Sequence, residues 1–144
     1  MRIKSGSQKG AAMVEFALIL IPLLLITFGI IEFGIIMYDK AMVTNASREG
    51  ARAGIVLRLT PAGDYNPLTD AEIESVVTGY LGNHLISFGS GSVVVTCAPA
   101  EPRVSGGQLT VTTTYTYDFL VLPNFATNLL GSIDLSAHTV MKME

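Results

Sequence analysis

Few residues of this sequence have the side chains and the spacing that catalysis requires. Asp134, Ser136 and His138 have the residue types of a hydrolytic triad, and they follow one another at i, i+2 and i+4 in an alternating polar and apolar segment. On a β-strand they would share one face but lie spread along it, whereas a triad converges on one reacting atom. The sequence also contains no G-x-S-x-G nucleophile motif. We therefore expect no catalytic residues and a protein that is not an enzyme.

Metal and cofactor sites have little support. His84 and His138 are far apart, and Cys97 is the only cysteine, so we expect neither a cysteine-based zinc site nor an internal disulfide. Cys97 fits a small core residue, and an intermolecular disulfide is the alternative if its compartment is oxidising. The formal net charge of -3 predicts no basic patch for nucleic acid. We expect no cofactor, no metal and no nucleic-acid partner.

Two carboxylates within an apolar segment are more informative. The segment "KGAAMVEFALILIPLLLITFGIIEFGIIMYDK" covers residues 9–40, and no charged residue lies between Glu15 and Glu32. Residues 11–38 are longer than the roughly 20 residues that cross a bilayer and longer than the apolar run of a secretory signal peptide. A single membrane-spanning helix is the prediction.

Flanking charge predicts the orientation of this helix. Arg2, Lys4 and Lys9 precede it without any acidic residue, whereas Asp39 and Lys40 follow it and cancel. The positive-inside rule then places the N-terminus in the cytoplasm and the C-terminal domain outside, which in a bacterium is the periplasm or beyond.

The two glutamates have different positions in the helix. Glu32 lies near its outer end, where we expect the side chain to reach toward the membrane surface. Glu15 lies five residues after Gly10. A cut after Gly10 would give Ala11 an α-amino group at i, i+4 from Glu15, on the same helix face. The alternative is a glutamate that is merely tolerated at the headgroup level.

These residues carry a resemblance to a known family. Gly10, Ala11, Glu15 and Phe16 in "GAAMVEF" resemble the processing site of type IV prepilins, and more narrowly that of Flp-type and TadE/TadF-like proteins of the tight-adherence (Tad) system. There a basic leader ends in glycine, and glutamate and an aromatic residue occupy mature positions five and six. The later stretch over residues 30–55 is similar to the rest of a TadE-like helix through Glu32, Phe33, Asn45, Ala46, Arg48, Glu49, Gly50, Ala51 and Arg52.

The resemblance implies a minor pilin or pseudopilin, because roughly 90 residues follow residue 55 and a major Flp pilin is much shorter. It implies cleavage after Gly10 by a prepilin peptidase, pairing of Glu15 with an N-terminal amine, and a need for the protein in pilus biogenesis and surface adhesion. The implied partners are the peptidase, other minor and major pilins and the Tad inner-membrane platform. The alternatives are a pseudopilin of another type IV-like or type II secretion machine and an unprocessed membrane-anchored periplasmic binding domain.

The remaining chain predicts a small α+β domain. The membrane helix should continue to about Arg58, and Gly50 and Gly54 permit close packing either on another helix or on the protein's own domain. Residues 57–70 should form a loop that ends in a capping box of Thr69 and Glu72, followed by a helix that Gly82 stops.

Three strands are predicted at residues 92–97, 108–119 and 132–142. They should form an antiparallel sheet that packs on the short helix. The apolar residues 119–131 should either cover the core or form a patch for a partner or the membrane surface. We predict three parts: a cytoplasmic leader over residues 1–10, the transmembrane and extended helix over 11–58, and the periplasmic domain over 59–144.

Overall fold

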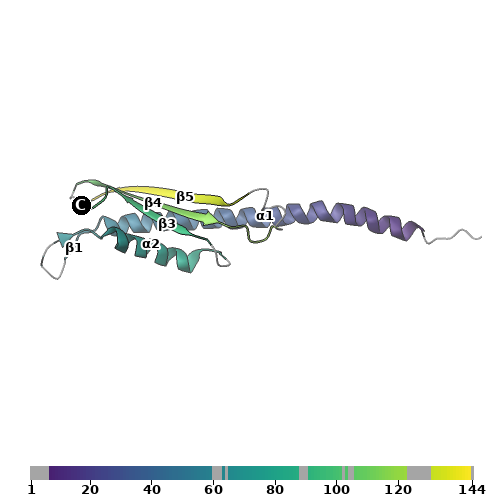
Figure 1. The fold of residues 1–144 in the computed structure, drawn as a ribbon, viewed down its shortest axis with the longest axis horizontal. Helices are drawn as coiled ribbons and strands as arrows, with labels where there is room; N and C mark the ends of the chain where they lie inside the picture. Colours follow the sequence, from purple (N-terminus) through teal and green to yellow (C-terminus); the bar gives the residue numbers. More distant parts are fainter. Residues whose placement is uncertain are drawn as a thin grey trace, which may run out of the picture.

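The computed structural model of the protein describes residues 7–59, 63, 65–87, 91–101, 103, 106–122 and 131–143. A long helix, α1 (Ser7–Gly54), carries a small domain along its C-terminal half and leaves its N-terminal half bare (Figure 1). The domain consists, in chain order, of β1 (Arg58–Leu59), β2 (Tyr65–Asn66), α2 (Asp70–His84), β3 (Val93–Ala98), β4 (Gln108–Tyr117) and β5 (Ile133–Lys142). The predicted α+β architecture is therefore confirmed.

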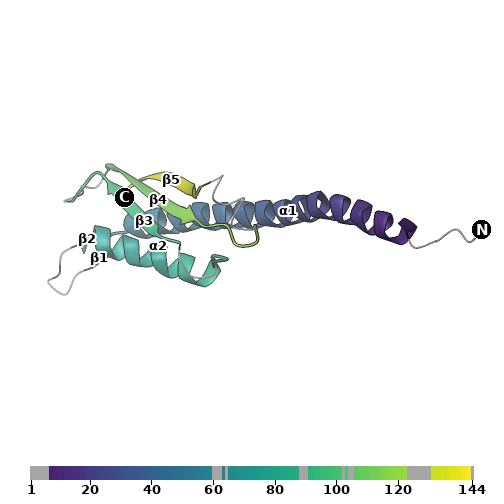
Figure 2. The ribbon, with the colours of Figure 1, turned by 45° about the vertical axis from the view of Figure 1, so that its right-hand side comes forward.

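The main sheet is antiparallel, with β4 between β3 and β5. Its inner face is packed by both helices, because α1 contacts β4, β5 and α2, and α2 contacts β3 (Figure 2). The predicted alternation of β4 is confirmed, since one side of the strand is buried: Leu109, Val111, Thr113, Tyr115 and Tyr117. The opposite side carries four half-exposed threonines: Thr110, Thr112, Thr114 and Thr116.

The C-terminal half of α1 packs closely on this sheet because its buried residues are small. Ala46, Ser47 and Ala51 are buried, and Gly50 and Gly54 lie on the same side of the helix. Ser47 Oγ donates to the carbonyl oxygen of Val111 on β4 at 2.8 Å. The side chains thus allow the helix backbone to approach the central strand.

Helix α2 begins as its sequence predicts and ends later. The capping box is present: the Thr69 hydroxyl accepts from the Glu72 amide, and the Glu72 carboxylate accepts from the Thr69 amide. Gly82 does not stop the helix, because its backbone is not in the left-handed region and α2 continues to His84. The end comes where Leu85 adopts an extended conformation, with its amide bonded to Leu81.

Two further boundaries differ from the prediction. α1 ends at Gly54 rather than near Arg58, and the next amides close a last turn on the carbonyls of Ala51 and Ala53. The predicted loop over residues 57–70 contains the short antiparallel pair of β1 and β2. In the apolar segment 119–131, Phe119 and Leu120 pack against the core as partly buried residues; residues 123–130 of this segment lie outside the described residues.

Candidate functional site

The bare half of α1 has the length and surface of a membrane span. Within the described part of the chain, one helix, Gly10–Gly54, is long and apolar enough to cross a membrane. Its first half exposes large apolar side chains such as Met13, Ile19 and Ile26. Residues 11–31 extend about 31 Å at the α-helical rise, close to the roughly 30 Å thickness of a bilayer's hydrocarbon core.

The residues of the predicted processing site all lie on this bare half. Gly10, Ala11, Glu15 and Phe16 are exposed, and Ala11 and Glu15 are one helical turn apart. No donor among the described residues contacts the Glu15 carboxylate. In the uncut chain the nitrogen of Ala11 is a peptide nitrogen inside α1, so the amine predicted to pair with Glu15 would exist only after cleavage.

Glu32 is in a different environment. It is 1% exposed, and its carboxylate accepts four hydrogen bonds. One comes from the Tyr117 hydroxyl at 2.5 Å. The others come from three successive backbone amides, of Leu120 at 2.8 Å, Val121 at 2.7 Å and Leu122 at 3.2 Å. Successive amides that point at one oxygen pair form an anion-binding concavity. We call this arrangement the Glu32 site.

The prediction that the Glu32 side chain reaches out of the protein toward the membrane surface is therefore wrong, because its carboxylate is bonded inside the domain. Its donors come from the end of β4 and from the turn after it, between 85 and 90 residues away in sequence. One signal in the sequence points to a buried position. Glu32 lies on the same helix face as the residues that pack on the domain, at the spacing i, i+7, i+11, i+14 and i+18: Asp39, Val43, Ala46 and Gly50.

Asp39, two turns further along this face, makes a second contact of the same kind. Its side chain is buried, and Oδ1 accepts from the Ile86 amide at 3.0 Å, just after α2. Lys40 donates from Nζ to the carbonyl oxygen of Ser136 on β5. Polar groups of α1 thus contact three separate segments of the domain at the end nearest the bare half of the helix.

The Tyr117 hydroxyl is fixed as a hydrogen-bond donor. Its burial, together with its bond to Glu32, raises the pKa of Tyr117 well above the usual range of a phenol. The hydroxyl therefore keeps its proton throughout the physiological pH range. Glu32 thus accepts from a neutral phenol and not from a titrating group.

Gly50 and Gly54 pack on the protein's own domain, which was one of the two predicted possibilities. A Cβ on Gly50 would lie 2.4 Å from Cγ2 of Val77 on α2. A Cβ on Gly54 would lie 2.5 Å from Cδ2 of Leu109 on β4 and 2.7 Å from Cδ1 of Ile73 on α2. Neither position can hold a larger residue unless these side chains move.

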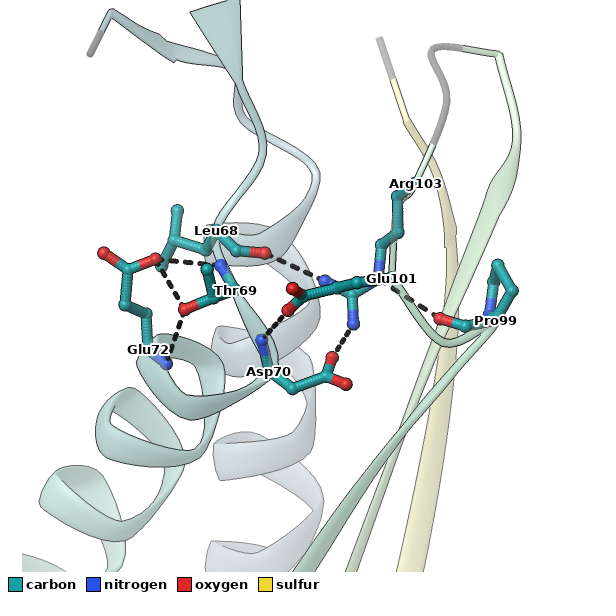
Figure 3. A network of polar contacts seen from close by, with 7 residues as sticks. All are labelled: Leu68, Thr69, Asp70, Glu72, Pro99, Glu101 and Arg103. Carbon is teal, nitrogen blue, oxygen red and sulfur yellow. Dashed lines mark hydrogen bonds and ion pairs between the residues drawn. The ribbon is translucent and has the colours of Figure 1, made fainter.

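A polar network that the sequence did not indicate joins the β3–β4 connection to the start of α2 (Figure 3). The buried Arg103 guanidinium donates to the carbonyl oxygens of Leu68 at 2.8 Å and Pro99 at 3.3 Å, and it pairs with the Asp70 carboxylate. Glu101 accepts from the Asp70 amide. A cavity of about 250 Å³ is lined in part by Arg103 and Glu101, but the Arg103 guanidinium is already bonded to protein groups.

The residues with catalytic side chains are placed as their spacing predicts. Asp134, Ser136 and His138 lie along the exposed face of β5, and Asp134 accepts from the Thr116 hydroxyl at 2.8 Å. His138 lies opposite Thr112 in the sheet. Among the described residues, no three histidine, cysteine or acidic side chains lie close enough together to hold a metal ion.

Cys97 lies on the inner side of β3 and packs, partly buried, against the core with Val93 and Val95. Burial raises the pKa of its thiol, and the nearby carboxylates of Glu101 and Glu74 raise it further. This environment matches the predicted small core residue and disfavours the reactive thiolate.

Comparison with known proteins gives one result that bears on the N-terminal helix. No curated protein matches the chain, and no solved structure matches it. A protein-family model described as "TadE-like protein" matches residues 10–52. The matched segment includes Glu15, Glu32 and Gly50, and it confirms the resemblance seen in the sequence. Over residues 10–52, which form nearly all of α1, this chain is similar to the TadE-like protein family.

Proposed function

We propose that the protein is a single-pass minor pilin or pseudopilin of a Tad (Flp) pilus and that it performs no chemistry of its own. In this proposal a prepilin peptidase removes residues 1–10 on the cytoplasmic face. The mature helix then packs into or beside the pilus or its inner-membrane platform, and the domain lies on the outer side of the membrane. Its contribution is to pilus biogenesis and, through the pilus, to surface adhesion.

The observation that carries the proposal is the family match itself. It covers residues 10–52, which include Gly10, Ala11 and Glu15, the residues that the proposal assigns to processing and assembly. Gly10 and Ala11 are exposed on the bare part of α1, where an enzyme at the membrane surface can reach the bond between them.

The chemistry of Glu15 supports the same proposal. A carboxylate in the apolar part of a membrane helix is costly unless it is paired. Glu32, the other acid of the apolar segment, has four donors within the protein, and Glu15 has none among the described residues. Cleavage would create an α-amino group at Ala11, one helical turn from Glu15. Glu15 would pair with this amine or with that of a neighbouring copy, and the pair would carry no net charge.

The experiment that tests processing is N-terminal sequencing of the mature protein from cells with and without the prepilin peptidase. We expect a start at Ala11 with the peptidase and at Met1 without it. Gly10→Leu should block the cut. Gly6→Leu is the matched control, because it changes a glycine of the same leader and should leave cleavage unchanged.

A mature protein that begins at Met1 in the presence of the peptidase would contradict the proposal. That result would favour the unprocessed membrane-anchored binding domain. Correct cleavage together with co-purification with a type II secretion machine, and not with Tad pilins, would favour the pseudopilin of another system.

A further inference from the structure

The boundary between the bare and the covered parts of α1 lies at Glu32. Residues 11–31 account for the hydrocarbon thickness, and Glu32 is the first fully buried residue of the helix. The domain therefore begins one residue beyond the apolar span, with no stalk of polar residues in between. If α1 spans the membrane, the domain must start at the membrane surface.

The Glu32 site determines which part of the domain lies at this level. Its three amide donors belong to Leu120, Val121 and Leu122, so the turn after β4 is held against the helix at Glu32. Among the described segments of the domain, this turn reaches farthest along α1 toward the N-terminus in both views (Figures 1 and 2). Ile133, which pairs with Tyr117 at the same end of the sheet, is 36% exposed.

The side chains of this turn are apolar although the turn lies at the surface of the domain. Phe119 and Leu120 pack partly on the core, and Val121 and Leu122 are half-buried and are not among the residues packed against it. A turn that supplies its amides to a carboxylate needs no apolar side chains for that purpose. Val121, Leu122 and the partly exposed Ile133 therefore give this end of the domain apolar surface that the core does not use.

The exposed side of α1 shows how far the apolar surface continues along the helix beyond Glu32. Phe33 is 62% exposed, and Met37 and Tyr38 are also exposed, so apolar surface continues for nearly two turns beyond Glu32. Beyond the hydrocarbon thickness of residues 11–31, residues 32–38 extend about 10 Å along the helix, which is enough to cross the outer interfacial layer of a bilayer. The Glu32 site lies beside Phe33 and so falls within the outer interfacial layer.

We propose that the turn of residues 119–122, together with Ile133, lies in the headgroup layer of the membrane and seats the domain on the lipid surface. The occupant of this surface is lipid, and the inference rests on α1 spanning the membrane. The attraction is apolar, because the charged residues nearest the turn in sequence and in the sheet, Asp118 and Asp134, are acidic and do not favour anionic headgroups. Glu32 then links the span to the seated turn.

Tryptophan fluorescence can test this directly, because the chain contains no tryptophan. Single replacements, Leu122→Trp and Ile133→Trp, would be made in the full-length protein, reconstituted in phosphatidylcholine vesicles with or without bromine on the lipid acyl chains near the headgroups. We expect blue-shifted emission and a loss of intensity on bromination at both positions.

Two further variants calibrate the depth. Ile26→Trp, in the part of the bare helix nearer the domain, reports whether α1 is inserted, and Tyr65→Trp reports the far end of the domain, where the tyrosine is 65% exposed. We expect bromination to quench the former and to leave the latter unchanged.

The outcomes separate the two inferences. If bromination quenches Ile26→Trp but neither Leu122→Trp nor Ile133→Trp, α1 spans the membrane and the proposed contact of the domain with lipid is overturned. No quenching at Ile26→Trp would overturn both. Equal quenching at Tyr65→Trp would mean that the domain lies on its side, which also contradicts the proposal. If Leu122→Trp does not fold, Ile133→Trp decides alone.

Discussion

Glu32 is a buried carboxylate whose four donors are all electrically neutral. Three backbone amides and one phenol provide them, and hydrogen bonds to a charged group each contribute roughly 1.5–3 kcal/mol. The amides of residues 120–122 are fixed by the turn, so the carboxylate contacts them at only one rotation of α1 about its axis. Glu32 thus adds a directional contact at the edge of the domain to the packing of Asp39, Ser47, Gly50 and Gly54 further along α1.

We expect Glu32→Leu to destabilise the domain by about 2–4 kcal/mol, because it leaves the Tyr117 hydroxyl and the amides without an acceptor but also removes the cost of burying a charge, which offsets part of that loss. Thermal unfolding in detergent, followed by the near-ultraviolet circular dichroism of the tyrosines, measures this. Glu15→Leu is the matched control, since the same substitution removes a carboxylate that no described residue contacts. Equal melting temperatures for the two variants would contradict the role given to Glu32.

At the scale of elements, the contact of α1 with the sheet and α2 depends on Gly50 and Gly54, which have no side chain. The methyl groups of Val77, Ile73 and Leu109 occupy the positions of a Cβ on Gly50 or Gly54. Close packing of helix on sheet is thereby achieved within one molecule. The small residues on this face are then unavailable for close contact with a neighbouring helix.

Gly50→Ala and Gly54→Ala should each destabilise the domain by about 1–3 kcal/mol, the usual cost of overpacking a core. Gly29→Ala provides the control, because nothing lies within 4 Å of its Cβ position and alanine favours the helix. Denaturant unfolding of the three variants measures the difference. Wild-type stability in Gly54→Ala would show that α1 does not approach the sheet this closely.

The capping box of α2 predicts a dependence on pH. Hydrogen bonds from the Thr69 amide and hydroxyl lower the pKa of Glu72 in the folded protein. A lowered folded-state pKa means that the stabilisation is complete above the pKa of the unfolded chain and is lost as the pH falls through the folded value.

Glu72→Gln should therefore reduce the loss of stability between neutral and acid pH, because the glutamine does not titrate. Glu74→Gln, at an exposed position of α2 outside the capping box, is the matched control. Denaturant unfolding at a series of pH values from neutral to acid compares the three proteins. Parallel profiles for Glu72→Gln and the wild type would exclude the capping contribution.

The elements that depend on local sequence could be predicted, and the contacts between distant segments could not. The β4 alternation, the Thr69 cap and the apolar length of α1 are local patterns, and each is present. The donors of Glu32 and the partners of Arg103 come from segments that only the tertiary fold brings together. The end of α2 was missed because an isolated glycine is compatible with a helix unless the chain needs a positive φ there.

At the scale of the whole molecule, the two acids of the apolar segment are in different environments. Glu32 has four hydrogen-bond donors inside the chain, where the covered part of α1 begins. Glu15 lies about 6 Å along the helix from Ala11 and has no partner among the described residues. No described part of the domain contacts Glu15, so under the proposed function its partner is the N-terminal amine of the mature protein.

We therefore expect Glu15→Leu to abolish association with partner pilins without changing cleavage after Gly10 or the unfolding of the domain. Glu15→Asp keeps the charge on a shorter side chain and should retain part of the association. Co-purification from crosslinked membranes measures association with partner pilins. N-terminal sequencing measures cleavage after Gly10, and thermal unfolding measures the stability of the domain. If Glu15→Leu assembles as the wild type does, the carboxylate is only tolerated at the headgroup level, and the unprocessed anchor becomes the better account. If it loses assembly while remaining cleaved and folded, the paired amine of a mature pilin helix accounts for the loss, because no other function of the residue has been disturbed.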